Sequence, residues 1–252
     1  MRKYFIAGNW KLHKGPAEAA SFAKKLAGSV DTCDHRVLVA PPFISIPAVA
    51  ESLQGSDILI GAQNCAASEN GAHTGEVAPH MLKEAGVSVV IIGHSERRAV
   101  YGETDELINT KVKLALSAGL EVILCVGETL DEREAGKAMA VVTEQLKNGL
   151  QGVDEASLSQ VTIAYEPVWA IGTGKTATPD DANEIHAGIR SVISGLYSAA
   201  AADKLVIQYG GSVKPANVKE LMAMEHIDGA LVGGASLTTE NFLPIVHFDK
   251  EL

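Results

Sequence analysis

Eight short apolar runs alternate with helix-forming segments along the chain, and this alternation predicts a single closed (β/α)8 barrel around an all-parallel, eight-stranded sheet. The stretch between successive runs is long enough for at least one helix. The chain has 252 residues, of which 46% are hydrophobic, and α/β barrels often occupy about 250 residues as one domain. We therefore expect residues 1–252 to form one α/β domain.

The predicted strands are runs of apolar and β-branched residues. The run Val-Val-Ile-Ile at 89–92 has no polar position, which is typical of a parallel strand covered on both faces. The predicted strands are Tyr4–Asn9, Arg36–Ala40, Ile58–Ala62, Val89–Gly93, Glu121–Val126, Val161–Tyr165, Leu205–Tyr209 and Gly229–Val232.

The segments between these strands are rich in Ala, Leu, Glu and Lys, as helices are. Asp180 and Asp181 follow Pro179 and place negative charge where a helix dipole favours it. Gly86 and Gly119 fit positions just past two helix C-termini. The predicted helices include Ala17–Ala27, Ile46–Leu53, Thr104–Ala118, Gly136–Leu150, Asp180–Ala200 and Pro215–Met224.

An open, doubly wound sheet is the alternative architecture. Such sheets usually have fewer strands, and many carry a glycine-rich dinucleotide fingerprint after the first strand. The first strand here ends Ala-Gly-Asn-Trp-Lys at 7–11 and lacks that fingerprint. No linker, low-complexity tract or repeat divides the chain.

The composition narrows the possible partners and compartment. Lys and Arg number 21 against 31 Asp and Glu, a formal net charge of −10, so we expect no nucleic-acid partner. Cys33, Cys65 and Cys125 lie far apart without a Cys-x-x-Cys pair, which indicates reduced thiols. Neither a signal-peptide core nor a membrane-spanning apolar run is present, so we expect a soluble, cytoplasmic protein without a membrane partner.

Glu166 stands where the sixth strand stops. Pro167 cannot continue a sheet ladder, and the following loop is first apolar and then glycine-rich. This pattern favours a general base beneath a hinged lid that excludes water; the alternative is a structural strand end followed by an ordinary loop. The predicted lid residues are Pro167, Val168, Trp169, Ala170, Ile171, Gly172, Thr173, Gly174, Lys175, Thr176 and Ala177.

Glycine pairs follow the last two strands, as Gly210-Gly211-Ser212 and Gly233-Gly234-Ala235-Ser236. In barrels these two loops often bind phosphate, because glycine lets backbone N–H groups point at an anion. Two tight turns would be the alternative, but their occurrence on adjacent strands favours a phosphate site.

Asn9 and Lys11 end the first strand. Lys11 can neutralise a phosphate or a developing enolate, form a Schiff base, or be a surface charge. Asn9 can hold Lys11, donate to a substrate oxygen, or simply be a turn residue.

His94 ends the fourth strand and precedes Ser95, a typical N-cap residue. The positive end of a helix disfavours an imidazolium, so we predict a neutral His94 that donates a hydrogen bond to a substrate oxygen; a structural histidine is the alternative. Glu96 can pair with Lys11 or with the arginines that follow. For Arg97 and Arg98 we expect ion pairs on the helix surface.

No cluster of His, Asp or Glu has metal-ligand spacing, so we expect no metal and no cofactor. A base, a neutral hydrogen-bond donor, a lysine and a phosphate cup suit proton abstraction next to a carbonyl in a small phosphorylated substrate.

Five segments together resemble the triosephosphate isomerase family, and they follow the family's order nearly from end to end. The resemblance implies a TIM barrel that interconverts dihydroxyacetone phosphate and D-glyceraldehyde 3-phosphate through an enediolate, in glycolysis and gluconeogenesis, without a cofactor. The segments are Ala7–Lys11, Gly93–Arg98, Ala164–Gly174, Tyr209–Val213 and Leu231–Ser236.

The resemblance also assigns roles. It makes Glu166 the base and His94 the neutral electrophile, with Lys11 and Asn9 supporting charge on the substrate. Ser95 and Glu96 support these groups. The N–H groups that grip the phosphate lie near Gly172, Ser212, Gly233 and Gly234.

The long segment at 64–79 inserts into a neighbouring subunit in that family, so a homodimer is implied. His73 stands where an aromatic residue is usual, and Leu12 replaces a frequent methionine.

Two further hypotheses concern other activities. One is a Schiff-base aldolase that uses Lys11; the other is a catalytically silent barrel kept for interactions. A silent barrel should have lost a base, an electrophile or a lid residue, and none is missing.

Overall fold

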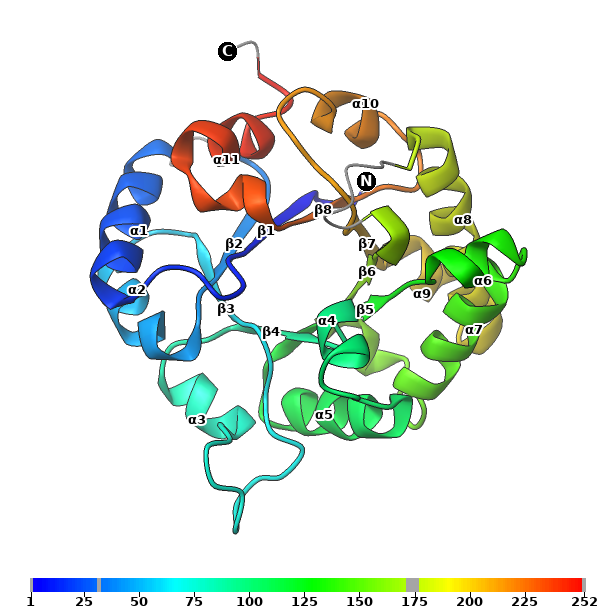
Figure 1. Cartoon of the computed structure of the whole chain (residues 1–252), viewed down its shortest axis with the longest axis horizontal. Coiled ribbons are helices and arrows are strands. Elements are labelled where there is room, and N and C mark those ends of the chain that lie inside the picture. The colour runs from blue at the N-terminus through cyan, green and yellow to red at the C-terminus, as the bar shows by residue number, and fades with distance from the viewer. Residues whose placement is uncertain (1, 31–32, 171–176, 251–252) are drawn as a thin grey trace.

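The computed structural model confirms the closed barrel (Figure 1) and describes residues 2–30, 33–170 and 177–250. All strand pairs are parallel and follow chain order, and β1 pairs with β8 to close the sheet. The strands are β1 (Phe5–Asn9), β2 (Arg36–Ala40), β3 (Leu59–Ala62), β4 (Val89–Ile92), β5 (Glu121–Val126), β6 (Val161–Tyr165), β7 (Val206–Tyr209) and β8 (Gly229–Val232).

Helices surround the barrel as a ring (Figure 1). They are α1 (Pro16–Val30), α2 (Ile46–Ser52), α3 (Pro79–Glu84), α4 (Ser95–Ala99), α5 (Asp105–Ser117), α6 (Leu130–Glu134), α7 (Ala138–Gly149), α8 (Pro179–Leu196), α9 (Ala199–Lys204), α10 (Val218–Met222) and α11 (Thr239–Val246), with short 3₁₀ turns η1 (Phe43–Ser45), η2 (Ala156–Gln160), η3 (Val168–Ala170) and η4 (Gly234–Leu237).

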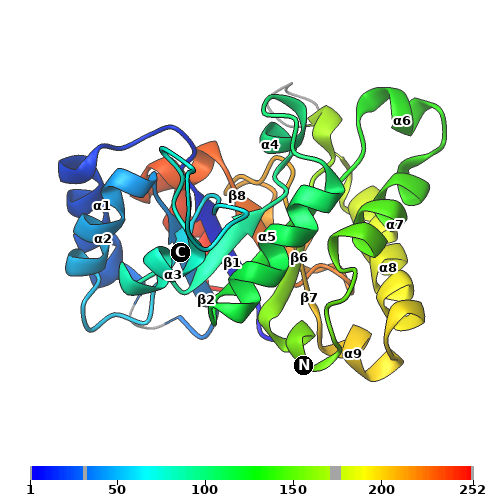
Figure 2. The same cartoon turned by 90° about the horizontal axis from the view of Figure 1, so that it is seen from below.

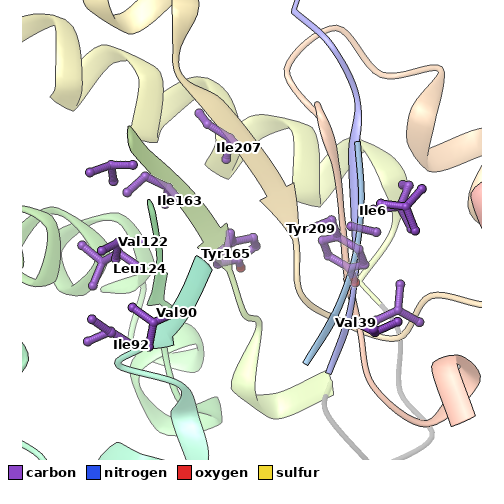
Figure 3. Packing of buried hydrophobic residues seen from close by; sticks show 14 of the residues in the cluster. Ile6, Val39, Val90, Ile92, Val122, Leu124, Ile163, Tyr165, Ile207 and Tyr209 are labelled. Carbon is purple, nitrogen blue, oxygen red and sulfur yellow. The ribbon is translucent and has the colours of Figure 1, made fainter. Parts of the chain in front are cut away.

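Each strand buries both of its faces, as the apolar runs predict. Val89 and Ile91 of β4 point into the barrel and belong to the inner cluster. Val90 and Ile92 point outward and belong to the larger cluster, part of which Figure 3 shows. Alternation along one strand therefore supplies two cores, one inside the barrel and one beneath the helices.

The strand predictions agree closely with the structure. The predicted strands at 36–40, 121–126, 161–165 and 229–232 have the observed bounds, and the other four differ by one residue at one end. Gly93 lies just outside β4, in the left-handed region with φ of 74°. The chain therefore turns sharply before His94.

The single helix predicted at Asp180–Ala200 is wrong, because the structure has two helices there. α8 ends before Tyr197, whose backbone is no longer helical (φ −129°, ψ −98°). The Tyr197 hydroxyl reaches the carbonyl oxygens of Leu150 and Val153 at 3.3 and 3.1 Å. The Ser198 hydroxyl then caps α9, so a tertiary contact and a new cap interrupt an otherwise helical sequence.

Helix α4 lies at one end of the barrel and α9 lies toward the other (Figure 2). The end that carries α4 is where the strands finish and where their polar side chains gather. Among the described helices, none is long and apolar enough to cross a membrane. Cys33, Cys65 and Cys125 are free thiols.

Candidate active site

A cavity of about 520 Å³ lies where the strands end. It brings together seven of the residues predicted for the site, namely Asn9, Lys11, His94, Glu166, Ser212, Gly233 and Gly234. The other residues that line it are Gly210, Gly211, Val213, Lys214, Pro215, Leu231, Ala235 and Asn241.

Glu166 is buried against the N-terminus of α4, with only 1% of its surface exposed. Its Oε2 accepts a hydrogen bond from the Ser95 backbone N–H at 2.9 Å. Its Oε1 accepts one from the Ser95 hydroxyl at 3.1 Å and lies 3.0 Å from His94 Nε2. The carboxylate is therefore held by three donors in this arrangement.

His94, rather than Ser95, is the N-cap of α4, which corrects the capping predicted from the sequence. The His94 Nδ1 atom accepts a hydrogen bond from the Glu96 backbone N–H at 3.2 Å. A nitrogen that accepts carries no proton, so this bond favours the tautomer with its proton on Nε2. That proton points at Glu166.

Burial and the neighbouring charge shift the pKa values of Glu166 and His94 in opposite directions. Burial alone raises the pKa of Glu166, but the charge and hydrogen bond of His94 and the bonds from Ser95 bring this pKa below its ordinary value. Burial alone lowers the pKa of His94, but the neighbouring Glu166 raises it above its ordinary value. The neutral His94 predicted from the sequence thus depends on where the Glu166 carboxylate lies.

Lys11 is fixed by its neighbours in an unusual backbone conformation, with φ of 51°. Its N–H donates to Asn9 Oδ1 at 3.1 Å, and its carbonyl accepts from Gln63 Nε2 at 2.9 Å. Its Nζ forms an ion pair with Glu96 Oε1 at 2.7 Å. Asn9 and Glu96 therefore both hold Lys11 in the structure, which was one of the alternatives considered for each of them.

The ion pairs predicted on the helix surface for Arg97 and Arg98 are wrong in location. Arg97 pairs with the buried Glu103 at 2.5 Å. Arg98 pairs with Asp105 at 2.5 Å, and it also donates to the carbonyl oxygens of Gly93 and Cys125 at the ends of β4 and β5. Both arginines are half-buried. Arg98 braces α4 against the barrel, and Arg97 joins α4 to the loop before α5.

The glycine-rich loops after β7 and β8 face the same cavity. A β-carbon at Gly210 would lie 2.9 Å from Glu166 Cγ, so only glycine lets this loop approach the carboxylate so closely. Gly233 lies beside Lys11, and a β-carbon at Gly234 would meet no heavy atom within 4 Å. The backbone of these loops is therefore accessible to an anion beside a lysine.

The described part of the predicted lid starts from a buried anchor that sequence reasoning missed. Glu128 is fully buried and accepts hydrogen bonds from the Trp169 indole at 2.9 Å and the Tyr165 hydroxyl at 3.0 Å. The Glu128 carbonyl also accepts from the Val168 N–H at 3.1 Å. The position of Glu128, two residues after β5, was the signal in the sequence that could have found it.

Part of the predicted lid lies outside the described residues. Pro167 to Ala170 and Ala177 are described; the lid residues Ile171, Gly172, Thr173, Gly174, Lys175 and Thr176 lie outside the described residues.

Comparison with known proteins identifies the family. A family model described as triosephosphate isomerase matches residues 4–249. The chain belongs to the triosephosphate isomerase family. Three curated relatives bear the name triosephosphate isomerase. One from Carboxydothermus hydrogenoformans is 58% identical over 98% of both chains. One from Treponema denticola is 54% identical over 99% of this chain and 100% of its own, and one from Syntrophotalea carbinolica is 53% identical over 98% and 99%.

The triosephosphate isomerase family interconverts dihydroxyacetone phosphate and glyceraldehyde 3-phosphate in glycolysis. The family consists of isomerase enzymes. Membership therefore argues against both the Schiff-base aldolase and the catalytically silent barrel. The pairing of Lys11 with Glu96 also suits a charged lysine better than a Schiff-base nucleophile. Across residues 2–30, 33–170 and 177–250, no group of three or more His, Cys, Asp or Glu is arranged to hold a metal ion.

Proposed function

We propose that Glu166 is the base that moves a proton between C1 and C2 when this chain interconverts dihydroxyacetone phosphate and D-glyceraldehyde 3-phosphate. The observation that carries this assignment is the buried Glu166 carboxylate, 3.0 Å from His94 Nε2, in the wall of a cavity that Lys11 also lines. Base, hydrogen-bond donor and cation thus surround one space.

The pKa shifts suggest how the base becomes strong enough. A substrate carbonyl that takes the Nε2–H bond of His94 removes that bond from Glu166. A carboxylate that turns away from His94 and Ser95 loses the interactions that lower its pKa, while burial continues to raise that pKa. Glu166 then accepts the proton from one carbon and returns it to the next, while a second proton passes between the two substrate oxygens, so no oxidant or reductant is needed.

The remaining roles belong to residues that line the same cavity and, as the family resemblance implies, to Gly172 and the lid. Lys11 and Asn9 support negative charge on the enediolate, with Lys11 held by Glu96. The backbone N–H groups of Ser212, Gly233 and Gly234, together with that of Gly172, grip the phosphate. The lid from Pro167 to Ala177 closes over the intermediate and excludes water.

The test is turnover of the purified chain on glyceraldehyde 3-phosphate in the presence of EDTA, with dihydroxyacetone phosphate followed through an NADH-linked reductase. Glu166→Gln should lower kcat by about 10³-fold or more, with little change in the affinity for inorganic phosphate. Glu220→Gln, an exposed change of the same kind on α10, should leave kcat unaltered. Near-normal turnover by the Glu166→Gln variant would overturn the assignment.

We infer also that the chain forms a homodimer through the 64–79 segment. Figure 1 shows this segment (cyan) extending beyond the ring of helices. A second cavity of about 470 Å³ shares Asn9, Lys11 and His94 with the first. Leu12 and Tyr101 line this second cavity with 93% and 67% of their surfaces exposed.

A partner's 64–79 segment would cover this apolar surface and support residues of the site. In the tip of that segment, the polar ring of His73 would take the place of the usual aromatic contact. Sedimentation velocity at micromolar concentration should show a dimer, and a monomer would refute the inference.

Two broader expectations complete the proposal. Residues 1–252 act as one domain, supported by the pairing of β1 with β8, and should unfold in a single calorimetric transition. The protein works in the cytoplasm, which suits the free thiols and the glycolytic reaction; cell fractionation checks this.

A further inference from the structure

The charges around the cavity do not by themselves attract a phosphate ester. Among the described residues that line it, Lys11, Lys214 and Glu166 carry formal charge, and Lys11 is paired with Glu96 at 2.7 Å. With His94 neutral, the two lysines only balance the two carboxylates. Without Lys214 the site would carry one net negative charge, in a chain whose formal charge is −10.

Lys214 stands at the mouth of the cavity, in the loop between β7 and α10, and its side chain is exposed. Its backbone N–H donates to Asn217 Oδ1 at 2.8 Å. Asn217 Nδ2 in turn donates to the Ser212 carbonyl at 3.0 Å. One side chain therefore fixes the backbone of Lys214 relative to Ser212, whose N–H belongs to the proposed phosphate grip.

Lys214 also has a charge that no described carboxylate neutralises, since no ion pair joins it to residues 2–30, 33–170 or 177–250. Lys11 lies deeper and is paired. An unpaired cation at the mouth of a concave site raises the local potential that an incoming anion meets.

We propose that Lys214 captures the substrate phosphate electrostatically at the mouth of the cavity and delivers it to the backbone N–H groups of Ser212, Gly233 and Gly234. This role rests on the proposed function and adds a residue to it. Lys214 acts on arrival, and the proton transfer takes place without it. The effect of Lys214 therefore belongs to kcat/KM and depends on ionic strength.

The experiment compares Lys214→Gln with Lys219→Gln. Lys219 is exposed on α10, five residues further along, and does not line the cavity, so both variants remove one surface charge. At about 0.02 M salt, Lys214→Gln should lower kcat/KM about three- to tenfold through KM, while kcat changes less than about twofold. Lys214→Glu should lower kcat/KM further. At about 0.5 M salt the difference from wild type should shrink below about twofold, because screening removes the attraction.

Equal effects of the Lys214→Gln and Lys219→Gln changes would overturn the proposal, as would a loss that persists at high salt or resides in kcat. Calorimetry of inorganic phosphate binding at low salt measures the attraction between Lys214 and phosphate independently of turnover. Weaker phosphate binding by Lys214→Gln than by Lys219→Gln would support the capture role even if wild type lacked isomerase activity. Equal phosphate binding by these two variants would refute it, whatever the turnover.

Discussion

Gly210→Ala tests whether the close approach of the loop after β7 to Glu166, the proposed base, matters for catalysis. Gly210 follows β7, and its N–H donates to the Tyr165 carbonyl at 2.7 Å. A β-carbon there would lie 2.9 Å from Glu166 Cγ and 3.0 Å from the Tyr165 carbonyl oxygen. The φ of Gly210 is outside the left-handed region, so lack of space alone opposes the change.

The size of the effect follows from these distances. Ordinary carbon contacts begin at about 3.5 Å, so the ends of β6 and β7 must separate by roughly half an ångström. The carbonyl is backbone and cannot rotate away. Overpacking of this kind costs about 1–3 kcal/mol of the free energy of unfolding. A misplacement of about 1 Å at a reacting group costs up to about 10²-fold in rate, so for about half that displacement we expect kcat to fall about tenfold.

The assay is kcat and KM for glyceraldehyde 3-phosphate, combined with urea unfolding. Gly195→Ala is the matched control, because a β-carbon there meets nothing within 4 Å and the residue lies in α8. That variant should keep full activity and gain up to about 1 kcal/mol of stability. If Gly210→Ala kept more than half of the wild-type kcat, the loop and the base would not be coupled as the contact implies.

Two further predictions concern buried groups. Burial lowers the pKa of His186 to about 3, so between pH 6.5 and 3 the unfolded chain binds a proton that the folded chain does not, and stability falls as pH falls. Wild type should lose about 2 kcal/mol from this group between pH 6.5 and 4.5. In urea unfolding at the two pH values, His186→Asn should lose less free energy of unfolding than wild type as the pH falls. An equal loss in both proteins would contradict the prediction. Glu128→Gln weakens hydrogen bonds from Trp169 and Tyr165 to a buried carboxylate and should cost about 1–3 kcal/mol of the free energy of unfolding. It should also lower kcat, because the segment that follows Glu166, the proposed base, is anchored at Glu128; unchanged stability and turnover would speak against this anchor.

The barrel was predictable because its signal is repeated and local. Each strand is a short apolar run such as Val89–Ile92, and the repetition of such runs between helix-forming segments locates the strands. The break between α8 and α9 was not predictable in this way. The α8 sequence continues into Ala-rich helix-forming residues, and the interruption at Tyr197 depends on hydrogen bonds to Leu150 and Val153. Leu150 and Val153 are distant from Tyr197 in sequence, so local helix propensity cannot predict these hydrogen bonds.

The site shows the same division. The rule that functional side chains follow parallel strands pointed to Glu166 and His94, and the structure places Glu166 Oε1 3.0 Å from His94 Nε2. The rule does not say which donors a carboxylate meets, so the bonds from Ser95 to Glu166 were not predictable. Arg98 was misjudged for a related reason. A charged residue on a short helix is usually solvated, but Arg98 donates to carbonyl groups at the ends of β4 and β5 in addition to its ion pair with Asp105.

The pairing of β1 with β8 affects how the chain behaves while it is still being synthesised. In the closed barrel, each strand has a hydrogen-bonded neighbour on either side, so no open ladder remains for another molecule to extend. The two strands that complete the ring come from opposite ends of the sequence, and contacts between distant segments form slowly. During synthesis β1 emerges long before β8 exists and remains an apolar strand with an open edge. We expect the hazard of intermolecular strand pairing to fall on this nascent stage, where a chaperone that shields the first strands would act, and to end when the last strand docks.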